Sequence, residues 1–148
     1  LNAERALIFQ SDSVMIRSGI EKFEQYDYVG APWRLDNNER IQNLINTKQL
    51  QTVVGNGGFS LRNVSAMINI VESISSPDDE QEDIFFVKGL EKFGYKIPDK
   101  AVAQEFCVEV KLQQGKKLYH KKRPHALHAA WYYVHEDEIK RTLEYIFV

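Results

Sequence analysis

The sequence contains little sulfur: its 148 residues include one cysteine, Cys107, and two methionines. One thiol cannot form a disulfide within the chain, and it excludes a zinc site built from several cysteines. The single thiol and the lack of a secretory signal favour the cytoplasm, where thiols stay reduced. A chain that had lost its N-terminus would have lost any signal with it, so the location stays open.

Long apolar runs and an excess of basic residues are also missing. No run approaches the roughly 20 apolar residues of a membrane-spanning helix, so we expect no membrane span in this chain. The 19 lysines and arginines are outnumbered by 21 aspartates and glutamates, which gives a net charge of -2. Proteins that bind nucleic acids more often carry a basic surplus, so we expect no nucleic-acid partner.

What the sequence does contain fits one globular domain. Hydrophobic residues make up 43% of the chain and charged residues 27%, which is enough apolar material for a core. No linker, low-complexity block or repeat divides residues 1–148, so we predict a single domain. The chain begins at Leu1 and enters an apolar run almost at once, which indicates truncation at the N-terminus.

Short apolar segments alternate with longer amphipathic ones, and this alternation predicts an α/β fold. The run at residues 6–9, bounded by polar residues, is typical of a buried strand in a parallel or mixed sheet. We expect Pro32 to stop a second strand at 28–30, and Asn63 to cap the helix that follows it. Helices are predicted over residues 18–25, 38–50, 64–75, 82–93 and 136–147, the fourth of them closed by Gly94.

Asp12 lies just after the first predicted strand, between two serines. In open α/β sheets, ligands collect beyond the carboxyl ends of strands, where a carboxylate can hold a divalent cation with a phosphorylated ligand. The alternative is that Asp12 caps the helix that follows it in the chain. From this residue alone, the capping role is the favoured interpretation.

Three glycines in four residues, Gly55-Asn56-Gly57-Gly58, separate two strand-like segments, and we call them the glycine block. Glycine permits a positive φ or a close approach of the backbone to a ligand. A tight hairpin turn would need no ligand, since Asn-Gly is itself a strong turn signal. No Gly-Lys-Ser/Thr follows, so the block is not a nucleotide-binding P-loop.

Glu82 and Asp83 open a predicted apolar helix. A carboxylate in the first turn can act as a general base aimed into a cleft, or it can simply complement the helix dipole. The preceding Asp78, Asp79 and Glu80 form an acidic turn that we expect to be solvated.

Histidines, lysines and a tryptophan supply further candidates. His125 and His128 would share a metal if they lay one helical turn apart, although a solvated basic loop fits this segment equally well. The basic cluster at residues 116–123, which includes Lys121, suits a phosphate or diphosphate better than a duplex, unless it is an ordinary exposed loop. Trp33 follows Gly-Ala-Pro, where its ring could stack on a sugar or pack into the core.

Five blocks of sequence occur in an order that resembles a known family. They are residues 9–13 (FQSDS), 26–33 (YDYVGAPW), 54–62 (VGNGGFSLR), 82–86 (EDIFF) and 106–109 (FCVE). Over about residues 6–120 the chain resembles the DUF5672 family, which is similar to glycosyltransferases of the GT-A fold. The resemblance implies an α/β fold with a GT-A-like mixed sheet flanked by helices, here the C-terminal portion that holds the metal and the acceptor.

The resemblance also implies an activity and a cofactor. The protein would be a glycosyltransferase that moves a sugar from a nucleotide-sugar donor to a hydroxyl of a glycan, a protein or a small molecule. Mn²⁺ or Mg²⁺, bound by an Asp-x-Asp motif and a late histidine, would neutralise the leaving diphosphate. The motif falls on Gln10-Ser11-Asp12, so Asp12 is its remaining acidic ligand, and His120 is the best positional match for the histidine.

By the same resemblance, the glycine block would approach the donor sugar or the acceptor, and Trp33 would line the acceptor side. Lys121, from the basic cluster, would bind the phosphates of the donor. Asp83, with Glu82 beside it, would deprotonate the acceptor hydroxyl in an inverting enzyme and would only orient it in a retaining one.

Two other interpretations stay open. A GT-A domain places its nucleotide-binding half before the metal motif, which begins here at residue 10. A chain without that half could be a non-catalytic binding or structural module with a degenerate glycosyltransferase fold. A metal-dependent hydrolase is the third possibility, and it would need His125 and His128 to point inward together.

Overall fold

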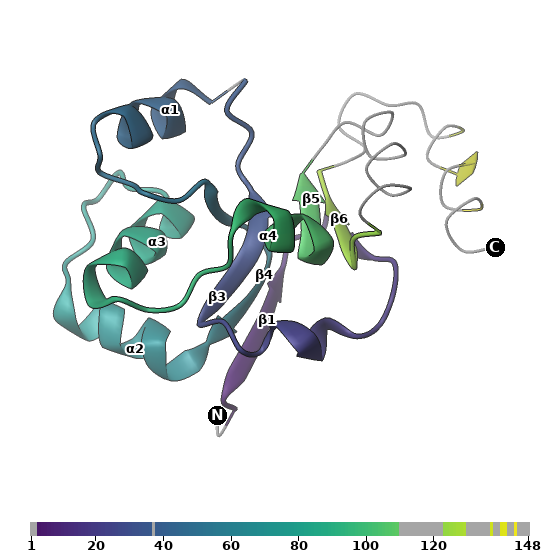
Figure 1. Ribbon diagram of the computed structural model, residues 1–148, viewed down its shortest axis with the longest axis horizontal. Helices are drawn as coiled ribbons and strands as arrows, with labels where there is room; N and C mark the ends of the chain where they lie inside the picture. The colour runs from purple at the N-terminus through teal and green to yellow at the C-terminus, as the bar shows by residue number, and fades with distance from the viewer. Residues whose placement is uncertain are drawn as a thin grey trace.

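The computed structural model describes residues 3–36, 38–109 and 123–129, together with Asp137, Lys140, Arg141 and Glu144. Its strands form two three-stranded sheets (Figure 1). The first sheet is antiparallel and has the order β1 (Arg5–Phe9), β4 (Val54–Asn63), β3 (Tyr28–Pro32). The second has the order β2 (Ser13–Met15), β6 (Ala126–His128), β5 (Cys107–Glu109), with β5 and β6 parallel.

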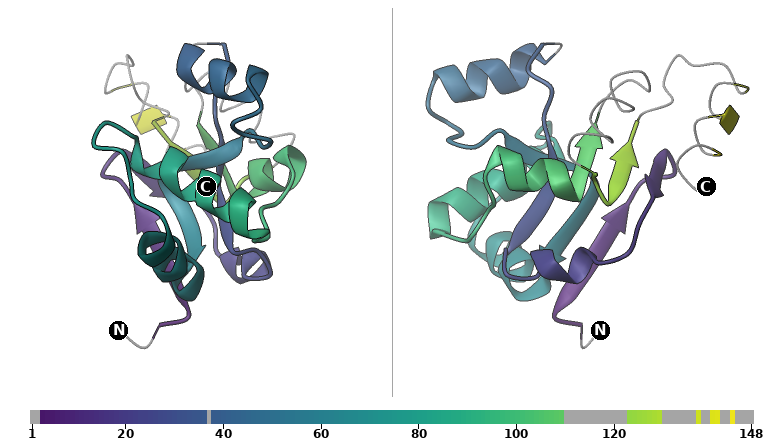
Figure 2. Two further views of the ribbon diagram at one scale, coloured as in Figure 1. Left: turned by 90° about the vertical axis from the view of Figure 1, so that its left-hand side faces the viewer. Right: turned by 45° about the vertical axis from the view of Figure 1, so that its right-hand side comes forward.

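Four α-helices and one 3-10 helix, η1 (Ile20–Phe23), accompany these strands in the described part of the chain. The α-helices are α1 (Glu39–Asn46), α2 (Val64–Ser73), α3 (Glu82–Phe93) and α4 (Lys100–Phe106). Figure 1 shows α1, α2 and α3 on one side of the central strands and β5 and β6 on the other. The second view in Figure 2 shows the same separation. The predicted α/β class is confirmed, as a mixed arrangement of strands and helices.

The alternation of side chains along β3 and β4 builds a core on each face of the first sheet. Tyr28 points to the face covered by α1, α2 and α3, while its neighbour Val29 points to the face covered by η1, α4 and the second sheet. Phe59 and Leu61 of β4 join Val29. The residues between and after them, Ser60 and Arg62, are buried on the helical side.

The helix ends follow the signals in the sequence. The Asn63 side chain accepts a hydrogen bond from the amide of Ala66 and so caps α2, as predicted. Helix α3 covers residues 82–93, also as predicted, and Gly94 ends it with a left-handed φ of 71°. The predicted helix at 38–50 is shorter, because α1 ends at Asn46 and Thr47 caps it.

Two predictions about strands are wrong. Strand β1 is an edge strand rather than a buried one, and Phe9 at its end is 66% exposed because nothing pairs with the outer side of β1 in the described sheet. Of the two alternatives for the glycine block, the hairpin turn is excluded, because the block lies inside β4, which continues through it as one ten-residue strand. Irregular pairing with β3 at Ala31 and Pro32 accommodates the block, and Pro32 lies within β3 instead of stopping the strand before it.

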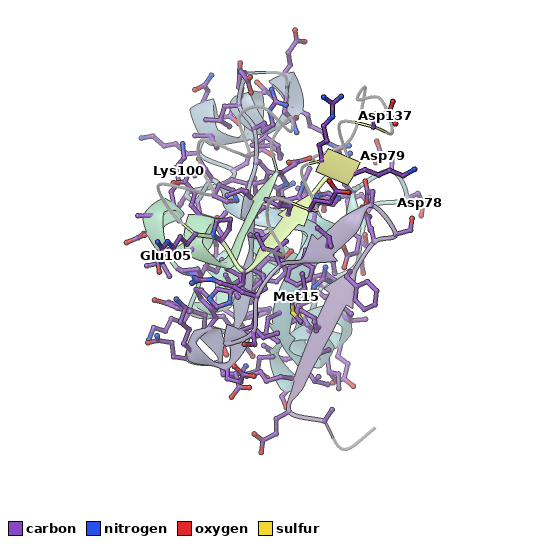
Figure 3. The ribbon with its side chains drawn as sticks, turned by 90° about the vertical axis from the view of Figure 1, so that its right-hand side faces the viewer. Met15, Asp78, Asp79, Lys100, Glu105 and Asp137 are labelled. Atoms are coloured by element: carbon purple, nitrogen blue, oxygen red, sulfur yellow. The ribbon has the colours of Figure 1, made fainter. Side chains whose placement is uncertain are left out.

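The acidic turn before α3 is solvated at Asp78 and Asp79, as predicted, and Figure 3 shows both at the edge of the molecule. Glu80 is half-buried and forms an ion pair with Lys88 at 2.6 Å. Most of the predicted helix at 136–147 lies outside the described residues, and the four described there are helical. In the part of the chain that the structure describes, no helix combines the length and apolar character that crossing a membrane would require.

Candidate functional site

A cavity of about 290 Å³ lies between the glycine block of β4, the first turn of α3 and the end of β6. These elements are distant in sequence and meet because β4 contacts both α3 and β6. The side chains and backbone that line the cavity come from Gln10, Asn56, Gly57, Gly58, Gln81, Glu82, Asp83 and His128. The cavity is the candidate functional site, because its lining combines two carboxylates, an imidazole and exposed strand backbone.

Asp83 is held by hydrogen bonds from three directions. Its Oδ2 accepts the indole N–H of Trp33 at 3.1 Å and the backbone N–H of Gly57 at 3.4 Å. Its Oδ1 accepts the backbone N–H of Ile84 at 2.8 Å. These donors fix the carboxylate at the start of α3, where the helix dipole favours a negative charge.

Glu82, the adjacent acid, has a different partner. It forms an ion pair with Arg62 of β4, whose guanidinium is 5% exposed and also donates to Ser60 Oγ at 2.9 Å. The same guanidinium lies 5.1 Å from the ring centre of Tyr28 and 5.4 Å from that of Phe86. Glu82 is therefore the direct ion-pair partner of a buried cation, and the nearby charge of Asp83 adds to its stabilisation.

His128 faces Asp12 across the second sheet. Its Nε2 lies 3.4 Å from Asp12 Oδ1 and 3.1 Å from Gln10 Oε1. The pairing of β2 with β6 brings them together, since Ser13 is opposite His128 and the amide of Ala129 donates to the Asp12 carbonyl at 3.1 Å. Burial lowers the pKa of His128, and the nearby carboxylates of Asp12 and Asp83 oppose that shift.

The glycine block is explained by close packing and not by unusual backbone angles. Positive φ occurs at Gly19 and Gly94 among the described glycines, and not in the block. A side chain at Gly58 would overlap the His128 ring, and one at Gly55 would overlap the Trp33 ring. The block therefore lets a histidine and a tryptophan lie directly against the strand.

Sequence reasoning overlooked Glu109, which ends β5 close to this site. Burial raises the pKa of its carboxyl, and the charges of Asp83 and Asp12 raise it further. Arg34 and a hydrogen bond with Asn56 act in the opposite direction. The residue belonged to the block at 106–109, but no local signal connects that block with residues so far away in the chain.

The structure brings together most of the predicted site residues. Asp83 and Glu82 line one cavity with Asn56, Gly57 and Gly58, whereas Gly55 lies against the Trp33 ring. Asp12 lies beside His128, which was not the histidine predicted for it. Trp33 reaches the site through its N–H, while its ring is buried in the core with 5% exposure. His120 and Lys121, like most of the basic cluster, lie outside the described residues.

The two histidines predicted to share a metal have separate surroundings. Both flank or end the short strand β6 instead of lying on a helix. His125 is 4% exposed, and its Nε2 is 3.1 Å from Arg17 Nη2, while its ring meets that of Phe23 edge-on. His128 faces Asp12 instead, so the convergence that a two-histidine hydrolase site requires is not found.

Asp12 and His128 supply a partial set of metal ligands. Across residues 3–36, 38–109 and 123–129, no three histidine, cysteine, aspartate or glutamate side chains are grouped so that they could hold a metal ion. The pair itself is suitable in chemistry, with a carboxylate and an imidazole and the amide oxygen of Gln10 beside them. Bonds of about 2.0–2.6 Å place adjacent ligand atoms roughly 3 Å apart, close to the separations seen here.

Comparison with known proteins identifies a family. No curated protein and no solved structure matches the chain significantly. A family model described as a protein of unknown function (DUF5672) matches residues 1–128, a range that includes every site residue described above. Since that range is most of the 148 residues, this chain belongs to the DUF5672 family.

Proposed function

We propose that this protein is a glycosyltransferase that moves a sugar from a nucleotide-sugar donor to an acceptor hydroxyl. One observation carries the proposal: the oriented carboxylate of Asp83 opens into a cavity that His128 also lines, with Asp12 against that histidine. A proton acceptor and a cation-binding pair on one cavity are what transfer from a diphosphate donor requires. The resemblance of the sequence blocks to GT-A enzymes supports the same reaction.

In the inverting reaction, Asp83 acts as the general base. Its carboxylate takes the proton from the acceptor hydroxyl as the hydroxyl oxygen bonds to the anomeric carbon of the sugar. The bond from that carbon to the diphosphate oxygen breaks, and the nucleoside diphosphate leaves with the bonding electrons. In a retaining reaction Asp83 orients the acceptor, and in either case Glu82 holds Arg62 and the first turn of α3 in place.

Asp12 and His128 would hold the divalent cation, with the remaining ligands supplied by the donor phosphates and water. Bound Mn²⁺ or Mg²⁺ would neutralise charge on the diphosphate. Gly58 contributes by leaving room for the His128 ring against β4. Gln10 adds an uncharged oxygen at the position where the metal motif has its first aspartate.

The proposal is tested by thermal unfolding with UDP- and GDP-sugars in the presence and absence of Mn²⁺. A ligand at about 100 times its Kd adds about 2.7 kcal/mol, which raises the melting temperature by roughly 5–10 °C for a chain of this size. We expect one nucleotide sugar to give this shift with Mn²⁺, and Asp12→Asn and His128→Gln to abolish it.

Asp79→Asn serves as the matched control, because Asp79 is an exposed aspartate on the turn before α3. It should respond like the unaltered protein. No shift with any nucleotide sugar would contradict the proposal and would favour the non-catalytic binding module, which predicts no affinity for nucleotide sugars.

A further inference from the structure

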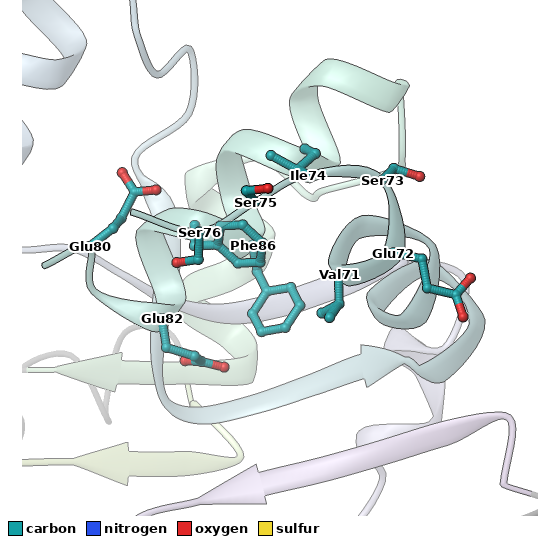
Figure 4. A pocket seen from close by; sticks show the side chains of 10 residues that line it. Val71, Glu72, Ser73, Ile74, Ser75, Ser76, Glu80, Glu82 and Phe86 are labelled. Carbon is teal, nitrogen blue, oxygen red and sulfur yellow. The ribbon is translucent and has the colours of Figure 1, made fainter. Parts of the chain in front are cut away.

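A second hollow lies on the other side of Glu82 and has a volume of about 510 Å³. It is bounded by the end of α2, the segment that links α2 to α3, and the first turns of α3 (Figure 4). We call it the α2–α3 groove. Its lining consists of Val71, Glu72, Ser73, Ile74, Ser75, Ser76, Glu80, Glu82, Phe85 and Phe86. The volume lies within the usual range of small-ligand sites, roughly 300–1,000 Å³.

The lining alternates between apolar and hydrogen-bonding groups. Figure 4 shows Phe86 of α3 between Glu82 on one side and Val71 on the other, with serines along the linking segment. Carboxylates accept hydrogen bonds from hydroxyl groups, and serine hydroxyls both donate and accept. A sugar ring matches this lining, because it presents hydroxyl groups at its edge and C–H groups on its faces.

The charge of the groove excludes a phosphorylated occupant. Three glutamates line it, and they are Glu72, Glu80 and Glu82. Lys88 and Arg62 balance two of these carboxylates, so the groove has no surplus of positive charge in its lining. The negative charge of Glu72 would repel a diphosphate there, whereas a neutral hydroxylated molecule would not be repelled.

The groove is adjacent to the candidate functional site. Glu82 lines both hollows, and the next residue along α3 is Asp83. Arg62 and the Phe86 ring, 5.4 Å from its guanidinium, fix the wall that separates them. A molecule in the groove would therefore meet the side chain of Glu82, while Asp83 faces the other hollow.

We infer that the α2–α3 groove binds a neutral sugar. The ring lies against Phe86, and its hydroxyls meet the carboxylates and serines of the groove. The groove is thus a sugar site beside the candidate functional site and separate from it, with Glu82 between the two hollows.

Two tryptophan substitutions on α2 separate the groove from the rest of the helix surface. Val71 lines the groove and is 58% exposed, so Val71→Trp fills the hollow without opening the core. Ile68 lies three residues earlier on α2, is 52% exposed and is not part of the lining, so Ile68→Trp is the matched control. Neither residue belongs to the candidate functional site.

The measurement is titration of the backbone amide NMR shifts with methyl glycosides of neutral hexoses and N-acetylhexosamines, each up to about 50 mM, ample for millimolar affinity. We expect at least one glycoside to shift amides in residues 71–76 and 80–86 in a saturable manner. Val71→Trp should weaken that binding at least tenfold, and Ile68→Trp should leave it unchanged. Inorganic diphosphate should not shift these amides.

The inference is overturned if no glycoside shifts the groove amides, if both tryptophan variants weaken binding equally, or if diphosphate binds the groove. Because the readout needs no turnover, it is independent of the nucleotide-sugar test at Asp12 and His128. Sugar binding in the groove without nucleotide binding would remove the transferase proposal and leave the sugar site. Nucleotide binding without sugar binding in the groove would remove the sugar site and leave the transferase proposal.

Discussion

Asp83 and Glu82 are neighbours in sequence, yet their carboxylates have different surroundings. Asp83 accepts N–H groups from Trp33, Gly57 and Ile84. Glu82 forms an ion pair with the buried guanidinium of Arg62. In the proposed reaction, Asp83 therefore transfers the proton and Glu82 has a supporting role.

Trp33→Phe tests whether the indole N–H positions Asp83. The substitution keeps an aromatic ring in the core and removes the hydrogen bond to Oδ2, so we expect kcat to fall about tenfold, since a hydrogen bond to a charged group contributes roughly 1.5–3 kcal/mol. KM for the donor should change little. Steady-state kinetics checks this.

Tyr28→Phe is the control for Trp33→Phe. Tyr28 lies in the same core cluster, and its hydroxyl donates to the Gly55 carbonyl at 2.7 Å and not to Asp83. This variant should lose about 1–3 kcal/mol of stability through the unpaired carbonyl and keep its kcat. An equal fall in kcat for both variants would show that Trp33 acts only through packing.

His125 makes the stability of the fold depend on pH. Arginine can only donate, so Arg17 donates to His125 Nε2, and the proton of the neutral ring sits on Nδ1, which has no partner in the described structure. Burial lowers the pKa of His125 below its ordinary 6.5, and the positive charge of Arg17 lowers it further. The folded state therefore binds fewer protons than the unfolded state.

The free energy of unfolding therefore falls as the pH falls. The contribution of His125 to the free energy of unfolding is complete above pH 6.5. It is lost as the pH falls from there through the lowered pKa of the folded protein. We expect His125→Gln, which keeps an acceptor for Arg17, to lose less stability between pH 7.5 and pH 5 than the unaltered protein. Urea unfolding at both pH values measures the difference, and identical pH profiles would contradict the assignment. His128 shifts in the same direction and is present in both proteins.

The glycine block in strand β4 could be interpreted only in part from the sequence. Asn-Gly is a turn signal and made a hairpin one of two alternatives, but the strand continues through the block. The glycines are required by the rings of Trp33 and His128, which lie far away in sequence and which no local pattern could reveal. The ends of α3, in contrast, depend on local residues, and they were predicted correctly.

Gly58→Ala tests the role of the glycine block. The added methyl group would overlap the His128 ring and move it away from Asp12, so the Mn²⁺-dependent thermal shift with the nucleotide sugar should be lost. Near-UV circular dichroism establishes that the variant is folded. Gly94→Ala is the control: its φ of 71° makes alanine cost roughly 1 kcal/mol, but it lies at the far end of α3 and should leave the shift intact. A folded Gly58→Ala protein with the full shift would contradict this role.

Asn63 stabilises the junction between β4 and α2 in two ways. Its Oδ1 caps α2, and its Nδ2 donates to Asp27 Oδ1 at 2.7 Å. Asn63→Ala should therefore cost more than the roughly 1 kcal/mol of a helix cap alone. Asn38→Ala, which removes only the cap of α1, is the comparison, and denaturant unfolding measures both. Equal losses would show that the bond to Asp27 contributes nothing.

In the whole molecule, the site depends on strand pairing within the second sheet and on contacts between β4 and β6, which join the two sheets. The sequence predicted the α/β class, Asp12 and the acids at the start of α3 as separate candidates. The pairing of β2 with β6, which makes His128 the partner of Asp12, connects residues 13 and 128. Such a pairing is set by the global fold, because three-residue strands carry too little pattern to specify their partners.

The central claim about the whole molecule is that Asp83 acts as the base in sugar transfer. The most direct measurement is release of nucleoside diphosphate from UDP- and GDP-sugars with Mn²⁺ and a panel of sugar acceptors, by the unaltered protein and by Asp83→Asn. We predict release that depends on the acceptor and falls at least about 100-fold in Asp83→Asn, the usual effect of losing a general base. Release that is equal in the two proteins, or no release from any donor, would contradict the account.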